Sequence, residues 1–254
     1  MMVQSTQTLL FRKPCIICAE THRDYGFLKK QNFDFAKKIA VVPLGFNEIP
    51  LAAKHYPVLF LENDNVVPVV IMSLSGKVNA FVQKDGQWLP GHYIPRTFQL
   101  YPFTLEKLPD QDNGVLIADM DCQAIIPNAD SHKNIRLFDS AGNPTPLLRE
   151  IASAAQQRYH DGIVGAEFAS LLRDSGVLTQ SLVQFVGPAG QNATAARLLA
   201  INEPAYRSLP VETIAGWFRS GWLDVASVVL LSQKIWSQWA LPANTAAPQQ
   251  TGRG

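Results

Sequence analysis

The chain has 254 residues, of which 47% are apolar and 17% are charged, and its net charge is +1 at pH 7. This composition is typical of a globular protein, and the length is sufficient to bury a core without disulfides or metals. With 22 basic and 21 acidic residues, the chain lacks the basic surplus of nucleic-acid-binding proteins, so we expect no nucleic-acid partner.

The cysteines, the N-terminus and the apolar runs indicate the cellular compartment of the protein. Three cysteines are an odd number, which does not fit a secreted disulfide framework. The first residues lack the basic start and the apolar run of a secretory signal. The longest apolar run, residues 225–231, is far shorter than a membrane span requires. We therefore expect a cytoplasmic protein without a membrane span, with export by a signal-less route left open.

The N-terminal half is typical of β-structure. After a weakly ordered arm over residues 1–20, short runs rich in β-branched and aromatic residues alternate with turn residues, and they predict a meander of antiparallel strands. The predicted strands are residues 39–44, 57–61, 66–72, 78–82, 115–119 and 137–142.

The C-terminal half changes to a helical period. Thr145 and Pro146 predict a helix start, with breaks at Gly162 and Gly165 and an end at Gly176. A hairpin of residues 183–186 and 197–201 follows, and then helices from Pro210 that pause at Gly221 and reach Trp239; residues 242–254 form a disordered tail. The fold class is α+β, with a mainly antiparallel sheet from the N-terminal half and helices concentrated in the C-terminal half. We predict a single domain over residues 21–241.

Aromatic residues beside prolines punctuate residues 55–103. Each proline restricts the backbone of its neighbourhood, and aromatic side chains offer a large contact area. This pattern favours either a rigid binding surface or a sheet edge packed under the C-terminal helices. The candidate binding residues are Trp88, His92, Tyr93, Arg96, Tyr101 and Phe103.

An ordered series of short motifs carries a family resemblance. It includes Thr21-His22-Arg23-Asp24, Phe33-Asp34-Phe35-Ala36, His55-Tyr56-Pro57, Asp85-Gly86-Gln87-Trp88, Tyr93-Ile94-Pro95, Tyr101-Pro102-Phe103, Ile201-Asn202-Glu203 and Gly221-Trp222-Leu223. In this order, over roughly residues 21–241, the series resembles the bacterial SapC family, which is unrelated to the similarly named peptide-transporter permease.

The resemblance implies a setting but no chemistry. The family name comes from an association with bacterial surface layers, and its members resemble accessory products encoded near flavin-dependent halogenase-like proteins and TonB-type receptors. This implies a role in handling peptides or envelope components. The family has no agreed catalytic residues, so none is assigned to this chain.

Two clusters have the residue types of a metal site. Cys15, Cys18 and His22 have the spacing of three zinc ligands, which Cys122 or another histidine would complete. The two cysteines also fit a redox pair, or an incidental motif in the arm. Asp119-Met120-Asp121 either binds a divalent ion or simply ends a strand. Apart from zinc, we expect no cofactor.

No motif for hydrolysis, nucleotide binding or dinucleotide binding is present in the sequence. An enzyme would therefore have to assemble its site from distant residues, such as His55, His92, Arg96 and Asp119. Four tryptophans of the last helices fit a core with an exposed rim, which leaves a homo-oligomer open; they are Trp217, Trp222, Trp236 and Trp239.

The sequence thus favours a non-enzymatic accessory protein that binds a peptide or protein partner in an envelope-related pathway. A peptide- or amino-acid-modifying enzyme and a surface-layer component are the two alternatives.

Overall fold

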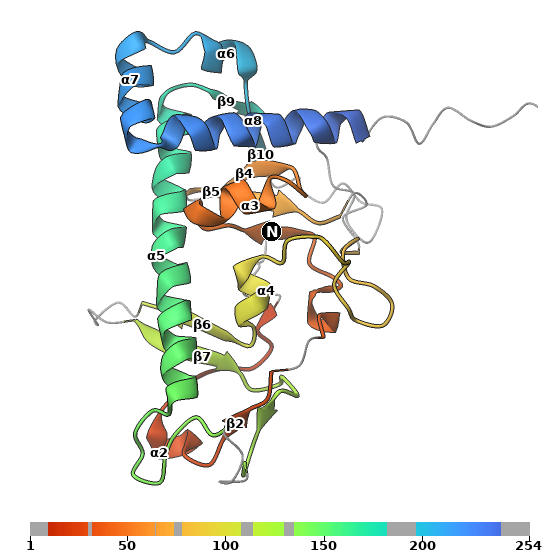
Figure 1. Cartoon of the computed structure of the whole chain (residues 1–254), viewed down its shortest axis with the longest axis vertical. Coiled ribbons are helices and arrows are strands. Elements are labelled where there is room, and N and C mark those ends of the chain that lie inside the picture. The colour runs from red at the N-terminus through yellow and green to blue at the C-terminus, as the bar shows by residue number, and fades with distance from the viewer. Residues whose placement is uncertain are drawn as a thin grey trace, which may run out of the picture.

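The structure is a computed structural model that describes residues 10–29, 32–63, 65–73, 78–107, 114–129, 135–181 and 197–239, with the backbone only for residues 197 and 235–239. The long helix α5 (Pro146–Asp174) runs along the molecule, and the strands lie beside it. Helix α8 (Trp222–Trp239) crosses α5 near its C-terminal end (Figure 1). The predicted α+β class is confirmed.

The largest sheet has five strands in the order β3-β5-β4-β10-β9, and every neighbouring pair is antiparallel. Its strands are β3 (Val41–Pro43), β4 (Val58–Glu62), β5 (Val66–Ile71), β9 (Leu178–Gln180) and β10 (Arg197–Ile201). The first three confirm predicted strands, but the predicted simple meander is wrong. Strand β5 pairs with both β3 and β4 and therefore lies between them, and a short helical segment of η2 (Phe46–Glu48) and α3 (Ile49–Ala52) connects β3 to β4.

Two further expectations about strands need correction. Residues 78–82 do not form a strand but a turn with a single bridge between Val82 and Trp88. The buried Asn79 explains this, because its side chain accepts a hydrogen bond from the Phe81 amide and so stabilises a turn instead of a ladder. In addition to β4, strand β10 pairs with β9, which follows α5 directly. Residues 183–186, the predicted hairpin partner of residues 197–201, lie outside the described residues.

A second sheet has three strands in the order β1-β7-β6, and β2 pairs with β8 beside it. The bounds are β1 (Pro14–Ile16), β2 (Gly26–Phe27), β6 (Phe103–Glu106), β7 (Val115–Asp119) and β8 (Ile125–Ile126). Strand β1 and the first two residues of helix α2 (Ala19–His22) lie within the expected weakly ordered arm. That expectation is wrong for residues 10–20, because β1 completes the free edge of β7; residues 1–9 and the expected tail 242–254 lie outside the described residues. Residues 137–142 form only a bridged turn between Phe138 and Pro144.

Helix α5 begins as the sequence predicts but does not break. The Thr145 hydroxyl accepts a hydrogen bond from the Leu148 amide, which caps the helix. The predicted breaks at Gly162 and Gly165 are wrong. A Cβ on Gly165 would lie 3.2 Å from the Leu44 carbonyl oxygen, so this glycine permits close packing of the helix against the segment after β3, whereas Gly162 faces open space.

The C-terminal helices are α6 (Glu203–Arg207), α7 (Val211–Ser220) and α8. Gly221, with a φ of +76°, separates α7 from α8 at the predicted pause. In the described part of the chain, no single helix has the length and apolarity of a membrane span. Residues 211–220 and 222–234 meet that test only together, as a pair bent by 96°.

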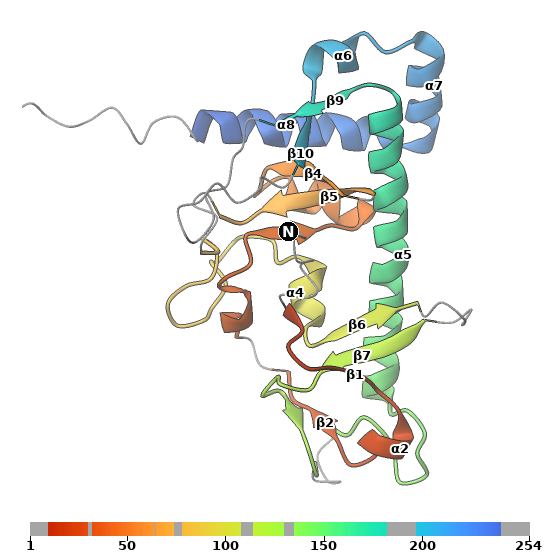
Figure 2. The same cartoon turned by 180° about the vertical axis from the view of Figure 1, so that it is seen from behind.

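Besides a minor group of buried apolar residues on the five-stranded sheet (Leu59, Val69, Ile71 and Leu198), two hydrophobic clusters hold the fold. The larger one lies between the five-stranded sheet, α3, α5 and α8, and the smaller one lies under β6, β7 and the start of α5. The short helix α4 (Arg96–Leu100) lies between the two sheets, as both views show (Figure 1; Figure 2). Because α4 and the preceding chain carry most of the candidate binding residues, those residues sit where the two clusters meet.

A candidate binding cavity between the two clusters

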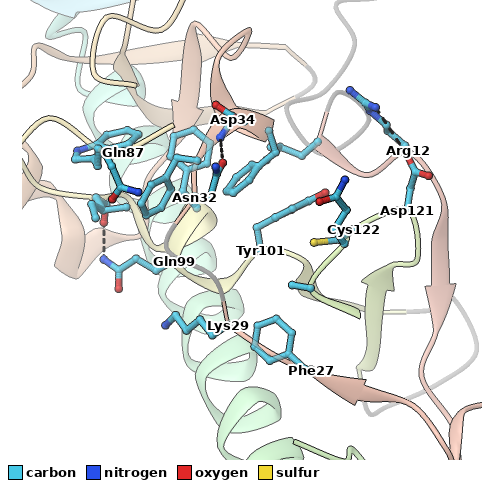
Figure 3. Close-up of a pocket in the computed structure, with 18 of the residues that line it drawn as sticks. Arg12, Phe27, Lys29, Asn32, Asp34, Gln87, Gln99, Tyr101, Asp121 and Cys122 are labelled. Carbon is cyan, nitrogen blue, oxygen red and sulfur yellow. Dashed lines mark hydrogen bonds and ion pairs between the residues drawn. The ribbon is translucent and has the colours of Figure 1, made fainter. Parts of the chain in front are cut away.

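A cavity of about 1100 Å³ opens beside α4. Its walls come from both hydrophobic clusters: Trp88 and Phe98 belong to the larger one, and Phe27 and Ala124 belong to the smaller one. Figure 3 shows Gln87 and Gln99 on one side of the cavity, Arg12 with Asp121 on the other, and Tyr101 between them. The volume is that of a small-molecule or peptide-segment site.

Aromatic rings form the floor of the cavity. Trp88 is only 7% exposed and contacts the rings of Phe33 and Phe98 at centroid distances of 5.5 and 5.7 Å. Tyr101 stacks on Phe35 at 4.0 Å, with the ring planes 23° apart. Such paired rings are rigid, so the floor has a fixed shape.

Among the described residues, eight exposed polar side chains line the rim. Four are carboxamides, two are basic and two are acidic. They are Arg12, Lys29, Asn32, Asp34, Gln87, Gln99, Asp121 and Gln123. Carboxamides both donate and accept hydrogen bonds, so this rim can pair with a ligand that presents both kinds of group.

Two buried carboxylates behind the cavity fix the chain that forms its wall. We name Glu48, Asp161 and their partners the Glu48–Asp161 network. Glu48 is 1% exposed and accepts hydrogen bonds from the Gly45 amide (3.0 Å), the Tyr93 hydroxyl (3.0 Å) and the Arg96 amide (2.7 Å). These bonds tie η2 to the start of α4, so they hold the Tyr93 side of the cavity in place.

Asp161 joins the same network from α5. It accepts hydrogen bonds from the Asn47 amide (3.0 Å) and side chain (2.7 Å), and the Arg96 guanidinium lies 3.4 Å away. A Cβ on Gly45 would lie 2.1 Å from an Asp161 carboxylate oxygen, so only glycine leaves room for this carboxylate. Sequence reasoning missed both acids, because an aspartate within a helix and a glutamate before Ile-Pro look like surface residues.

Arg158 lies next to this network without an ion pair of its own among the described residues. Its guanidinium donates to the Thr97 hydroxyl at 2.9 and 3.2 Å. Burial lowers the pKa of Arg158, and the charge of Glu48 opposes that shift. The arginine thus fixes α5 to α4.

A third buried carboxylate supports the cavity floor. Asp119 is fully buried and accepts hydrogen bonds from the Tyr101 hydroxyl (2.8 Å) and the Lys13 amide (2.8 Å). Burial, reinforced by the hydrogen bond to Asp119, raises the pKa of Tyr101. Burial also raises the pKa of the neighbouring Cys122 thiol, which therefore stays protonated and is a weak nucleophile.

The cavity brings together four of the six predicted binding residues: Trp88, His92, Tyr93 and Tyr101. Arg96 does not line it, because its guanidinium turns to Asp161. Phe103 is 2% exposed and packs edge-to-face on Phe27 in the smaller cluster, so it is a core residue. The aromatic stretch is therefore the wall of a cavity and not a raised surface patch.

The four residues that an assembled enzyme site would use do not converge on one point. His55 and His92 are ring neighbours at 5.4 Å, while Arg96 pairs with Asp161 and Asp119 with Tyr101. Burial, and then the charge of His92, lowers the pKa of His55. Of these four side chains only His92 lines the cavity.

The proposed metal ligands are only partly assembled. The Cys15 sulfur lies 3.8 Å from His22 Nε2, but the Cys18 sulfur contacts the Thr21 hydroxyl at 3.2 Å. Among the described residues, no three histidine, cysteine, aspartate or glutamate side chains are placed to hold a metal ion. Asp119 is buried and Asp121 exposed, so this pair does not converge either. Zinc binding stays a prediction.

Comparison with known protein families identifies the family of this chain. The sequence profile of the SapC family matches residues 17–238, which include α5, both large sheets except β1, and most of the cavity wall. The chain belongs to the SapC family. No curated protein and no solved structure matches the chain. The resemblance that the sequence motifs indicate is thus confirmed across nearly the whole described chain.

Proposed function

We propose that this SapC-family protein is a non-enzymatic accessory protein that binds a segment of a peptide or protein partner in the cavity beside α4. The observation that carries the proposal is the combination of a rigid aromatic floor with a carboxamide-rich rim. An extended peptide presents alternating donors and acceptors along its backbone and side chains that fit between rings, so both parts of the cavity suit it.

The placement of the titratable groups favours binding over catalysis. Catalytic sites gather an acid, a base or a nucleophile around one point of a cavity. Here Glu48, Asp161 and Asp119 have their hydrogen bonds satisfied by the protein's own donors, and Cys122 has a raised thiol pKa. These groups maintain the shape of the cavity and leave its rim to contact the ligand.

The biological setting rests on the family alone. The resemblance to SapC proteins implies a pathway that handles peptides or envelope components, and we place the proposed partner there. The structural surface-layer role stays an alternative, because no feature of the described residues tests it.

Selection from a random peptide library displayed on phage tests the proposal. We expect enriched peptides to bind the purified protein one-to-one, and the double variant Lys29→Ala/Gln123→Ala to weaken binding by about tenfold, because it removes two exposed rim contacts. The matched control is Lys38→Ala/Gln180→Ala, which changes an exposed lysine and an exposed glutamine outside the cavity. A library without enrichment, or equal losses in both variants, would contradict the proposal.

Trp88 is not suited to this test. Its ring lies in the larger cluster among other aromatic side chains, so Trp88→Ala would remove core packing as well as a cavity wall. The exposed rim residues separate binding from stability.

A further inference from the structure

Helix α7 has an apolar face that no described element covers. Val211 is 74% exposed and Phe218 is 67% exposed. The two residues are seven positions apart, which brings them onto the same side of a helix, two turns from each other. Trp217 lies about 100° around the helix from Phe218, is 4% exposed and packs into the larger cluster beside α8. One side of the helix is therefore packed on the protein, and the side with Val211 and Phe218 is exposed.

One edge of this exposed face carries two charges of opposite sign, about 100° around the helix from Val211 and Phe218. Glu212 lies in the first turn and Arg219 in the last. They are also seven residues apart, which is too far for the pairs that form within a helix at three or four positions. Neither has an ion pair recorded within the described part of the chain, and both are exposed. These charges thus have no partner in their own helix.

The order of these four residues is complementary to itself. If two α7 helices pack antiparallel around a two-fold axis, Val211 of one copy faces Phe218 of the other, and Glu212 faces Arg219. Both pairs are centred near Ala215, so a single axis satisfies them together. A two-fold interface requires this reciprocity, in which residue i meets residue j and j meets i.

We propose that α7 is a homodimer interface, in which the face formed by the exposed Val211 and Phe218 and the half-buried Ala215 packs antiparallel on the same face of a second copy. A face of ten residues is about 15 Å long, since each residue adds about 1.5 Å. Such a face buries less than the roughly 800 Å² per partner of a standard interface, so the dimer is weak, with a Kd on the order of 10 µM or higher. This inference does not depend on the proposed peptide site.

Sedimentation velocity over a concentration range that spans this Kd tests the interface. We expect the full chain to shift from monomer to dimer, and Phe218→Asp to weaken dimerisation by at least about a hundredfold, because it places a charge opposite Val211 in both halves of the interface. Circular dichroism shows whether the variant keeps its helices, and it should, since Phe218 is exposed.

Charge-reversal variants distinguish the antiparallel pairing of α7 from non-specific hydrophobic association. Glu212→Arg places two arginines opposite each other, and Arg219→Glu places two glutamates opposite each other, so each change alone should weaken the dimer by about tenfold. The double variant Glu212→Arg/Arg219→Glu restores opposite charges and should restore dimerisation. Rescue by the double variant supports the antiparallel pairing.

Other results would overturn the proposal. A chain that stays monomeric at all concentrations, or a dimer that Phe218→Asp and the single charge reversals leave unchanged, places the interface elsewhere or nowhere. A monomer that instead binds phosphatidylglycerol vesicles, and loses this binding in Phe218→Asp, shows that the face meets a lipid surface.

Discussion

The Glu48–Asp161 network and the cavity beside α4 are neighbours, but they treat polar groups in opposite ways. In the network, each carboxylate is buried and accepts hydrogen bonds from the protein's own donors. Around the cavity, charged and carboxamide side chains stand exposed at the rim above aromatic rings. Because an unsatisfied buried polar group is costly, the first arrangement maintains the fold, whereas exposed side chains such as Gln99 and Arg12 can exchange their present partners for a ligand. This contrast identifies the polar residues whose substitution should change stability and those whose substitution should change binding.

The largest expected effect comes from removing the Glu48 carboxylate. Glu48→Ala leaves the Gly45 amide, the Tyr93 hydroxyl and the Arg96 amide without their acceptor, so we expect the free energy of unfolding to fall by about 3–5 kcal/mol. Urea unfolding measures it. Glu48→Gln is the matched control and should lose less, because it keeps one acceptor oxygen. A loss below about 1 kcal/mol in Glu48→Ala would show that the network is not structural.

Alkaline pH should lower the free energy of unfolding, because three of the six tyrosines are wholly or partly buried and resist deprotonation in the folded protein. Burial raises the pKa of Tyr56, Tyr93 and Tyr101 above the ordinary value of about 10. Above that value the unfolded chain loses these phenol protons while the folded chain keeps them, so stability is complete below about pH 10 and falls as pH rises further.

From pH 10 to pH 11 we expect a loss of about 2–3 kcal/mol, allowing for the partial exposure of Tyr93 and Tyr101. Urea unfolding at each pH gives this loss, and absorbance near 295 nm reports the tyrosinates. If all six tyrosines ionised in one step near pH 10 while the protein remained folded, the burial of these hydroxyls would be disproved.

Two glycines of α5, the helix that carries Asp161, should have opposite effects on stability when they are replaced by alanine. Gly165→Ala should destabilise the protein by about 1–3 kcal/mol, because its Cβ would press on the Leu44 carbonyl and Pro68. Gly162→Ala, three residues earlier and in open space, should stabilise it by about 0.5–1 kcal/mol through helix propensity. Thermal unfolding of both variants checks the signs, and equal signs would contradict the packing that we describe.

The smallest expected effect concerns the cavity rim. Lys29→Ala and Gln123→Ala should each change the free energy of unfolding by less than about 0.5 kcal/mol, since both side chains are exposed. A loss comparable to that of Glu48→Ala would show that the rim, too, is part of the scaffold, and the distinction between the two regions would fail.

Much of the local structure could be predicted from the sequence. The β4 and β5 strands, the Thr145 cap, the glycine between α7 and α8 and membership of the SapC family all follow from residue types at short spacing. Of the site, the sequence indicated four cavity residues through their aromatic and proline neighbours. Such signals are local, because propensity, capping and turn chemistry depend on residues close in the chain.

The strand order, the burial of Trp88 and the structural role of Glu48 and Asp161 depend on tertiary contacts, which the sequence does not display. Glu48 and Asp161 are 113 positions apart and become neighbours only when α5 packs on the segment after β3, where Gly45 and Gly165 leave the space. No local pattern marks such an encounter, because the desolvation that makes a carboxylate structural depends on what the rest of the chain places around it.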